Sequence, residues 1–541
     1  MNGPPNGRNQ AYDAVVVGAG PNGLVAANHL VDAGWSVLLL EAQPEVGGAV
    51  RSAEDVHPGF VHDTCSSFYP LGAASPAITG LDLERHGLRW RHAPAVLGHP
   101  TPDGRWALLH RDRDVTARLL EKQHPGDGDA WLGLCRDWDR IGPALLDGML
   151  SPFPPVRAGG RLLVGLPQVG GLEFVRTLLT PAADLARTRF GGEAARLLLV
   201  GNAGHADIPL DGPGSGLMGL LMTMLGQTVG FPVPEGGAGE LAGALARRFT
   251  AVGGEIRTDS EVASIDVTHG RATGVRTVDG QRFAANRAVV ADVVAPRLYG
   301  RLVSAEDLPR RTVRRMKRFR MGPSTVKVDW ALDGAVPWAA KPEHAPGTLH
   351  IGDSPEQVQE ATGQVAAGVI PARPFLLAGQ MTTTDPTRSP AGTESMWAYT
   401  HVPQQTRRDD AETVRGVWDD ADCQHFADRM QDRVEALAPG FSSRILARRV
   451  LGPRELEAHN ANLLGGALDG GTANLDQQLI FRPVPGLGRA ETPIAGLFLG
   501  SCSAHPGGGV HGAPGRNAAR AALFHDRLPR LRRTPQPQET R

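Results

Sequence analysis

The chain has 541 residues, a length that predicts two or three domains rather than one simple core. Its 56 basic and 57 acidic residues almost cancel, so no whole-molecule field steers the protein onto nucleic acid or an anionic membrane. With 41% hydrophobic and 21% charged residues, the composition is that of a globular rather than a disordered chain.

The four cysteines are scattered singly along the chain, as Cys65, Cys135, Cys423 and Cys502. No CxxC pair or Cys/His cluster has metal-ligand spacing, so we expect no metal site and no redox-active dithiol. The N-terminus is polar, and no stretch approaches about 18 uninterrupted apolar residues. We therefore expect a cytoplasmic protein with neither a signal peptide nor a transmembrane helix.

The first segment is predicted to alternate strand, helix and strand, at residues 12–17, 23–33 and 36–41. Between the first strand and the helix, three glycines follow the pattern GxGxxG: Gly18, Gly20 and Gly23. In this setting the first glycine permits a tight turn and the second lets the backbone approach a pyrophosphate. The third lets the helix pack against the strand.

Two further features fit a dinucleotide at this turn. Pro21 and Asn22 lie at the start of the helix, where N–H groups and the helix dipole favour phosphate. Glu41 ends the second strand, 23 residues after Gly18, and there its carboxylate can accept hydrogen bonds from ribose hydroxyls. GxGxxG alone also fits an ordinary glycine-rich turn, but the strands, helix and acid in register predict a dinucleotide site.

A second glycine pair, Gly47 and Gly48, follows soon after Glu41, with Arg51 just beyond it. It resembles the pair with which glutathione-reductase-like and amine-oxidase-like flavoproteins pass close to the flavin end of FAD; NAD needs no such pair. The alternative is an ordinary turn. Because no second GxGxxG appears between a strand and a helix, we predict FAD and no separate NAD(P)H domain.

Further α/β pieces appear downstream. A helix is predicted at 239–252, strands at 255–258, 262–267, 273–277, 288–291 and 496–500, and a last helix at 516–525. We predict one FAD-binding domain built from three separate segments, 11–95, 236–300 and 470–528. A substrate domain would comprise 96–235 and 301–469, with flexible tails at 1–10 and 529–541. Independent domains in series are the alternative, but no piece alone completes a sheet.

Two segments resemble carotenoid desaturases and carotene ketolases: YDAVVVGAGPNGLVAANHLVDAGWSVLLLE (12–41) and GLFLGSCSAHPGGGVHGAPGRNAARAAL (496–523). The resemblance is strongest to the beta-carotene ketolase branch, which includes pyridine nucleotide-disulfide oxidoreductase domain-containing protein 2. Segments 234–265 and 475–486 agree. The resemblance implies an α/β fold, with a Rossmann-type FAD-binding domain of the glutathione-reductase/amine-oxidase-like kind interleaved with an α+β substrate domain.

The resemblance also implies positions around FAD. Val262 matches the position where the backbone meets the adenine. Gly500 and Ser501 match the strand end beside the pyrophosphate and ribityl chain. The loop under the isoalloxazine is matched by Gly508, Gly509 and Val510. Helix N–H groups just after that loop would stabilise the negative charge of reduced flavin.

Two histidines near this loop, His505 and His511, are the candidate catalytic residues, because imidazole can move a proton near neutral pH. The alternative is that they only hydrogen-bond the loop backbone. Residues 214–231 are apolar and rich in methionine, and they fit either the lining of a pocket for a lipophilic substrate or an ordinary core helix.

Residues 309–320, PRRTVRRMKRFR, predict a basic amphipathic helix with Val313, Met316 and Phe319 along one side. Such a helix can lie on the inner face of an anionic membrane, so peripheral membrane contact is one interpretation. A solvated basic face is the other.

These features predict an FAD-dependent oxidoreductase acting on a hydrophobic substrate such as a carotenoid or isoprenoid, by desaturation or ketolation through flavin-mediated C–H oxidation. No disulfide pair supports disulfide reduction. One alternative is an amine or small-molecule oxidase on the same scaffold, for which no acidic or aromatic lining can be located in the sequence. The other is a non-catalytic flavin-binding regulatory protein.

Overall fold

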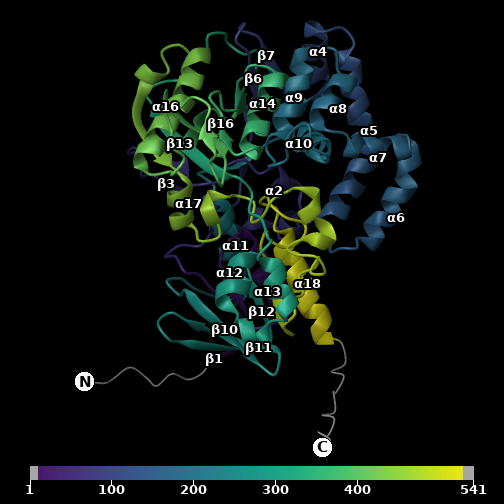
Figure 1. Cartoon of the computed structure of the whole chain (residues 1–541), viewed down its shortest axis with the longest axis vertical. Coiled ribbons are helices and arrows are strands. Elements are labelled where there is room, and N and C mark those ends of the chain that lie inside the picture. Colours follow the sequence, from purple (N-terminus) through teal and green to yellow (C-terminus); the bar gives the residue numbers. More distant parts are fainter. Residues whose placement is uncertain (1–9, 528–541) are drawn as a thin grey trace, which may run out of the picture.

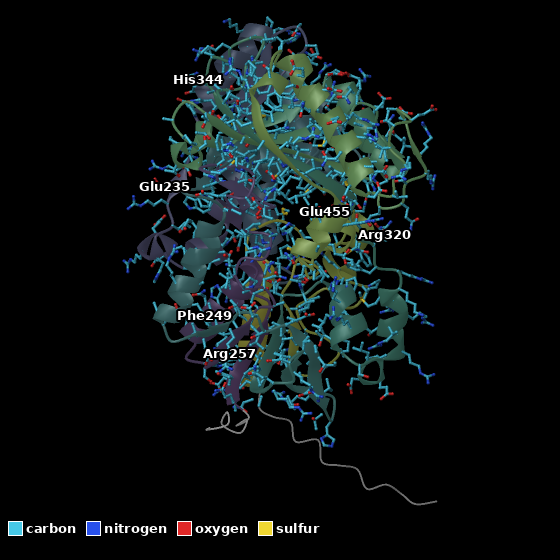
Figure 2. All side chains as sticks on the ribbon, turned by 90° about the vertical axis from the view of Figure 1, so that its left-hand side faces the viewer. Glu235, Phe249, Arg257, Arg320, His344 and Glu455 are labelled. Atoms are coloured by element: carbon cyan, nitrogen blue, oxygen red, sulfur yellow. The ribbon has the colours of Figure 1, made fainter. Side chains whose placement is uncertain are left out.

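The computed structural model describes residues 10–527 and contains two seven-stranded sheets, each packed with helices (Figure 1). The predicted tails at 1–10 and 529–541 lie outside the described residues, except for Gln10, which begins the first strand. The sheets lie toward opposite ends of the long axis. In Figure 2, turned by 90°, Phe249 and Arg257 mark the end with the first sheet and His344 marks the end with the second.

The first sheet has the order β10-β11-β12-β1-β2-β9, and β20 also pairs with β12. β1, β2 and β12 run parallel, as does β20 against β12, whereas β10 and β11 are antiparallel additions. Its strands are β1 (Gln10–Val17), β2 (Val37–Leu40), β9 (Glu255–Arg257), β10 (Val262–Thr268), β11 (Arg271–Thr277), β12 (Arg282–Ala291) and β20 (Leu497–Leu499).

Three helices from distant parts of the chain cover one face of this sheet: α1 (Pro21–Asp32), α11 (Gly239–Ala251) and α18 (Ala513–Arg527). Asn28 of α1 donates from Nδ2 to the carbonyl of Leu245 in α11 at 3.0 Å. On the other side, α18 passes so close to α1 that a Cβ on Gly515 would lie 1.9 Å from the carbonyl oxygen of Asn22. The beginning, middle and end of the chain therefore build one layer.

The second sheet has the order β19-β13-β17-β16-β14-β6-β7, and β13, between β19 and β17, is buried along its whole length. α16 (Asp420–Leu437) packs against it through Phe426, Met430 and Val434. The strands are β6 (Ala95–Pro100), β7 (Trp106–Leu109), β13 (Ser324–Leu332), β14 (Pro346–Ile351), β16 (Leu376–Gln380), β17 (Glu394–Val402) and β19 (Ile445–Leu451).

A helical layer flanks the second sheet, on the right of Figure 1. It comprises α4 (Arg113–Gln123), α5 (Asp127–Leu150), α6 (Val156–Gly165), α7 (Leu172–Leu179), α8 (Ala182–Arg189), α9 (Glu193–Ala203) and α10 (Ser215–Thr228). α9 and α10 are buried in this layer, whereas α6 and α7 lie at its outer edge (Figure 1).

Shorter elements join these layers. The helices are α2 (Pro70–Ala74), α3 (Pro76–Thr79), α12 (Ala295–Arg297), α13 (Arg310–Met316), α14 (Pro355–Ala366), α15 (Met381–Thr384) and α17 (Pro453–His459). Three two-stranded sheets pair β3 (Ser52–Ala53) with β4 (His62–Asp63), β5 (Trp90–Arg91) with β8 (Val233–Pro234), and β15 (Val369–Ile370) with β18 (Arg408–Asp409).

The basic helix expected over 309–320 is shorter, and its apolar side is not free. α13 ends at Met316, and Val313, Met316 and Phe319 pack against the core beneath the first sheet. These side chains are partly buried against the fold, so less of the apolar side of α13 is available to a membrane. Membrane contact through residues 309–320 stays a prediction.

Candidate active site

A cavity of about 610 Å³ lies between the two sheets. Its lining includes the ends of β1 and β2, the residue after β12 and the loop after β20, so it opens at the carboxyl ends of the parallel strands. Ligands of open α/β sheets bind at this edge. The remaining walls come from α10, the α5 C-terminus and the second sheet.

The glycine turn between β1 and α1 forms one end of the cavity. Gly18 has φ +95°, and a Cβ on Gly23 would lie 2.0 Å from the Gly18 carbonyl oxygen. Gly20 precedes the helix without a capping side chain, and Pro21 and Asn22 form its first turn. Gly18, Gly20, Pro21 and Asn22 line the cavity, whereas Gly23 lies behind them and permits the close packing.

Glu41 sits beside this turn and is 8% exposed. Its Oε2 accepts from the Ala19 backbone N–H at 2.7 Å, and its Oε1 accepts from that of Gln43 at 3.0 Å. These two bonds fix the carboxylate, while each oxygen keeps acceptor capacity toward the cavity that it lines. This geometry suits the hydroxyls of a ribose.

The second glycine pair folds back onto the first turn. Gly48 has φ +58°, a Cβ on it would lie 3.2 Å from the Gly20 Cα, and Gly47 N–H donates to the Ala19 carbonyl at 2.8 Å. Gly48 lines the cavity. Gly47 and Arg51 do not: Arg51 donates from Nε to the Gly48 carbonyl at 3.1 Å and supports the loop from behind.

Of the positions implied by the resemblance, some line the cavity and one lies behind its wall. Val262 and Ser501 line the cavity. Gly500 does not, since its N–H donates to the Ala291 carbonyl at 2.8 Å and continues the pairing of β20 with β12. It lies behind the wall, where a Cβ would be 3.1 Å from Val290.

The loop before α18 lines the opposite part of the cavity through Gly508, Gly509 and Val510. Gly509 has φ +104°, which favours glycine, and a Cβ on Gly508 would lie 2.9 Å from Asp469 Oδ1. His511 holds this loop: its Nδ1 accepts from the Ala513 N–H at 3.2 Å, so its Nε2 donates to the Gly508 carbonyl at 3.2 Å.

The two candidate catalytic histidines differ in what their ring nitrogens contact. Burial lowers the pKa of His511 to about 4, and both its nitrogens are engaged with backbone. His505 donates from Nε2 to the Ser151 carbonyl at 3.0 Å, while its buried Nδ1 has no protein partner. Burial also lowers the pKa of His505. Both lie along the cavity as neutral imidazoles, but only His505 keeps a free acceptor.

Asp292, which sequence analysis missed, follows β12 and enters the glycine turn. Its Oδ2 accepts from the Gly23 N–H at 2.9 Å, and it lines the cavity beside Gly20. Burial, with a contribution from the Glu41 carboxylate, raises the pKa of Asp292 to about 7. The signal was available: a polar residue directly after a buried strand at 288–291 lies at the carboxyl edge of the sheet.

Arg482 is a second missed residue, a fully buried cation at the cavity wall. It donates from Nε to the Cys502 carbonyl at 2.9 Å, from Nη1 to the Thr472 carbonyl at 2.9 Å and from Nη2 to the Asp469 carbonyl at 3.0 Å. Burial lowers its pKa. The guanidinium thus ties the 469–472 loop to the loop after β20.

The comparisons with known proteins agree with this geometry. Residues 16–81 match the model of an NAD(P)-binding Rossmann-like domain, and residues 170–429 match that of the flavin containing amine oxidoreductases. The chain is 30% identical to pyridine nucleotide-disulfide oxidoreductase domain-containing protein 2 of Mus musculus, across 96% of this chain and 95% of the relative. This chain belongs to the family of pyridine nucleotide-disulfide oxidoreductase domain-containing protein 2.

Two other similarities extend over the whole flavoprotein. The chain is 25% identical to a phytoene desaturase (lycopene-forming) of Paracoccus sp., across 95% of this chain and 97% of the relative. A solved structure of putrescine oxidase bound to putrescine has a TM-score of 0.60 at 17% identity, across 95% of this chain and 98% of that one. The predicted fold class is confirmed. The protein is an FAD-dependent oxidoreductase.

The residues around the cavity fit FAD. The bare backbone of Gly18 and Gly20 leaves room for a pyrophosphate, and Glu41 is fixed at the ribose position. The cavity lining also includes Ser501, Gly508 and Gly509, the positions that match the ribityl chain and the flavin loop. The four cysteines are free thiols.

We expect FAD affinity to fall above neutral pH because of Asp292. A pyrophosphate at the glycine turn disfavours the ionised carboxylate, so its pKa rises further on binding and a proton is taken up. The Kd should be constant below about pH 7 and rise by up to about tenfold per pH unit above it. Titrating apoprotein with FAD across this range tests the slope. Asp292→Asn should give a flat profile, and a flat wild-type profile would contradict the prediction.

Proposed function

We propose that this flavoprotein oxidises a hydrophobic substrate, such as a carotenoid or isoprenoid, by desaturation or ketolation. The observation that carries the proposal is the apolar wall of the cavity away from the glycine turn. It includes Phe68, Leu71, Leu217, Met218, Leu221, Met222, Phe231 and Leu377. A wall of this kind binds ligands mainly by excluding water.

α10 supplies the adaptable part of this wall. Leu217, Met218 and Met222 line the cavity from one side of the helix. Met224 and Leu225 pack into the helical core. The apolar segment predicted at 214–231 is therefore both a core helix and a cavity wall. Methionine side chains adjust to irregular ligands, which suits a long, flexible hydrocarbon.

In this proposal FAD carries out the oxidation, and the protein side chains accept a proton and position the substrate. FAD, when bound, accepts a hydride from an activated C–H bond. A desaturation also releases a proton from the neighbouring carbon, and we assign its acceptance to Nδ1 of His505, the unpartnered nitrogen at the cavity. His511 has no free nitrogen and positions the loop instead. The apolar walls exclude water and orient the chain of the substrate.

The name of the Paracoccus relative, a phytoene desaturase, supports a polyene substrate. The test is anaerobic titration of the purified yellow protein with a carotenoid and isoprenoid extract, followed at the flavin absorbance bands. Bleaching by the extract supports the proposal. A flavin that the extract leaves oxidised, while an amine panel bleaches it, would overturn it.

An amine substrate is a second candidate, because the cavity has the acidic and aromatic lining that the sequence did not reveal. Asp469 lines it beside Gly508, and burial together with Asp207 raises the pKa of Asp469 to about 7. The rings of Trp397 and Tyr399 stack at 5.9 Å with an angle of 19° and also line it. A carboxylate beside aromatic faces can hold an ammonium group.

Asp469→Asn separates the two candidates. If an amine is the substrate, loss of this carboxylate should lower kcat/KM by at least about 30-fold, since a buried ion pair loses one partner. If a polyene is the substrate, the rate of flavin bleaching should change by no more than about twofold. Asp476→Asn, a surface change at a carboxylate paired with Arg320, is the matched control and should be silent in both assays.

A further inference from the structure

α6 and α7, together residues 156–179 and called here the apolar hairpin, expose large aliphatic side chains. Val156, Leu163, Val164, Leu172 and Leu179 are between 55% and 85% exposed. Isolated exposed aliphatic residues are common on proteins. Five within 24 residues form an apolar patch of the kind that marks an interaction site.

The exposure does not come from a detached segment. The opposite sides of these helices pack on the protein: Phe174 is buried in the same core cluster as α10, and Leu162 approaches Gly148 of α5. Each helix is therefore apolar on two sides, one packed on the fold and one facing solvent. Both helices lie at the outer edge of the helical layer (Figure 1). No single helix within residues 10–527 is long and apolar enough to cross a membrane. The hairpin passes that test only as a pair bent by 102°, which suits lying on a membrane rather than spanning it.

The base of the hairpin is tied to a chain segment that follows the exposed part of the cavity wall. Leu475 and Leu479 line the cavity and are also exposed, so the cavity reaches the surface beside them. Leu479 begins a short exposed apolar turn, 479–481. Arg489, just beyond that turn, donates from Nε to the Phe153 carbonyl at 2.8 Å and fastens it to the base of the hairpin.

The charges of the hairpin favour an anionic partner. It carries three arginines, Arg157, Arg161 and Arg176, against one acid, Glu173. Arg176 pairs with Glu173 at 2.6 Å, and Arg161 reaches Asp147 at 3.3 Å, both at exposed positions where such pairs are weak. Exposed arginines beside inserted aliphatic side chains match the boundary between headgroups and acyl chains.

We propose that the apolar hairpin docks the protein onto an anionic lipid bilayer, with Leu163, Val164 and Leu172 inserted and the cavity mouth at 475–481 facing the lipid. This gives a lipid-dissolved substrate a path into the cavity without crossing water, a benefit that rests on the proposed function. The docking itself does not depend on it. α13 would contribute little insertion, because its apolar side chains are partly buried against the fold.

The test is co-sedimentation of the full-length, FAD-loaded protein with vesicles of phosphatidylcholine, alone or with about one phosphatidylglycerol in three lipids. The wild type should sediment with the anionic vesicles. Leu163→Ser/Val164→Ser/Leu172→Ser should weaken the partition constant more than about tenfold. The matched control, Val278→Ser/Val417→Ser/Leu446→Ser, changes three equally apolar exposed residues elsewhere and should bind like the wild type.

Two further measurements keep the outcome decisive. Arg157→Glu/Arg161→Glu should remove the preference for anionic vesicles, whereas Arg311→Glu/Arg314→Glu in α13 should leave binding unchanged; the reverse result would overturn the proposal. Light scattering checks whether a second copy covers the hairpin, and a dimer lost in the serine variant without vesicle binding would also overturn it. Failure of the proposed function would differ: vesicle binding with no bleaching by polyenes.

Discussion

The Gly23→Ala variant is expected to purify without its yellow colour and to bind added FAD at least about 100-fold more weakly than the wild type. A Cβ at this position would lie 2.0 Å from the Gly18 carbonyl oxygen, which belongs to the backbone and cannot rotate away. The helix must therefore move off the strand. That movement displaces both Gly20 and the Asp292 carboxylate, which accepts from the Gly23 N–H.

Visible absorbance of the purified variant and FAD titration of its apoprotein measure this effect. Circular dichroism should show that the helices remain. Gly363→Ala in α14 is the matched control, because a Cβ there meets nothing within 4 Å. That variant should keep its FAD and gain about 0.5–1 kcal/mol of stability, since alanine favours a helix over glycine. A yellow Gly23→Ala protein with unchanged affinity would contradict the role assigned to this glycine.

Arg482→Leu should lower the free energy of unfolding by about 3–5 kcal/mol. The guanidinium is fully buried and is the donor to the carbonyls of Asp469 and Cys502, which would be left without one. The Thr472 carbonyl would keep its bond from Gln478 Nε2 at 2.9 Å. Urea denaturation followed by fluorescence measures the change. Arg482→Lys keeps the charge but not the fork of donors, and should recover only part of the loss.

The control for this prediction is Arg320→Leu, which removes an exposed arginine paired with Asp476. Surface pairs contribute about 0–1 kcal/mol, so its unfolding should barely change. If Arg482→Leu unfolds at the same urea concentration as Arg320→Leu, the buried guanidinium does not stabilise these loops.

Local pattern was enough to predict the cofactor half of the protein. The first strand, helix and second strand follow from hydrophobic periodicity and a glycine turn, and the acid at Glu41 follows from its place at a strand end. Each of these features depends on residues that are close together in the sequence. The later strands were found for the same reason, although β10 and β12 extend beyond their predicted limits.

What the sequence did not reveal depends on contacts between distant segments. Asp469 reaches the cavity only because its loop folds against Gly508, and the role of Arg482 depends on carbonyls up to 20 residues away. The hydrophobic periodicity of the sequence indicates neither the position of Asp469 nor the role of Arg482. α13 shows the converse: its pattern is amphipathic, but the pattern alone does not say whether the core or a membrane covers the apolar side. His511 was found as a residue, yet its engagement with backbone appears only in the folded loop.

The pairing of β20 with β12 and the packing of α18 on α1 have a consequence for biogenesis. Synthesis proceeds from the N-terminus, and domains tend to fold as they emerge. Every strand of the second sheet, from β6 to β19, is translated before residues 497–527 exist. The nascent chain can therefore complete its substrate half while the nucleotide half, begun first, still lacks a strand and a helix. We therefore expect FAD to bind only after translation has ended. A chain whose synthesis stops before residue 497 should lack bound FAD and its yellow colour.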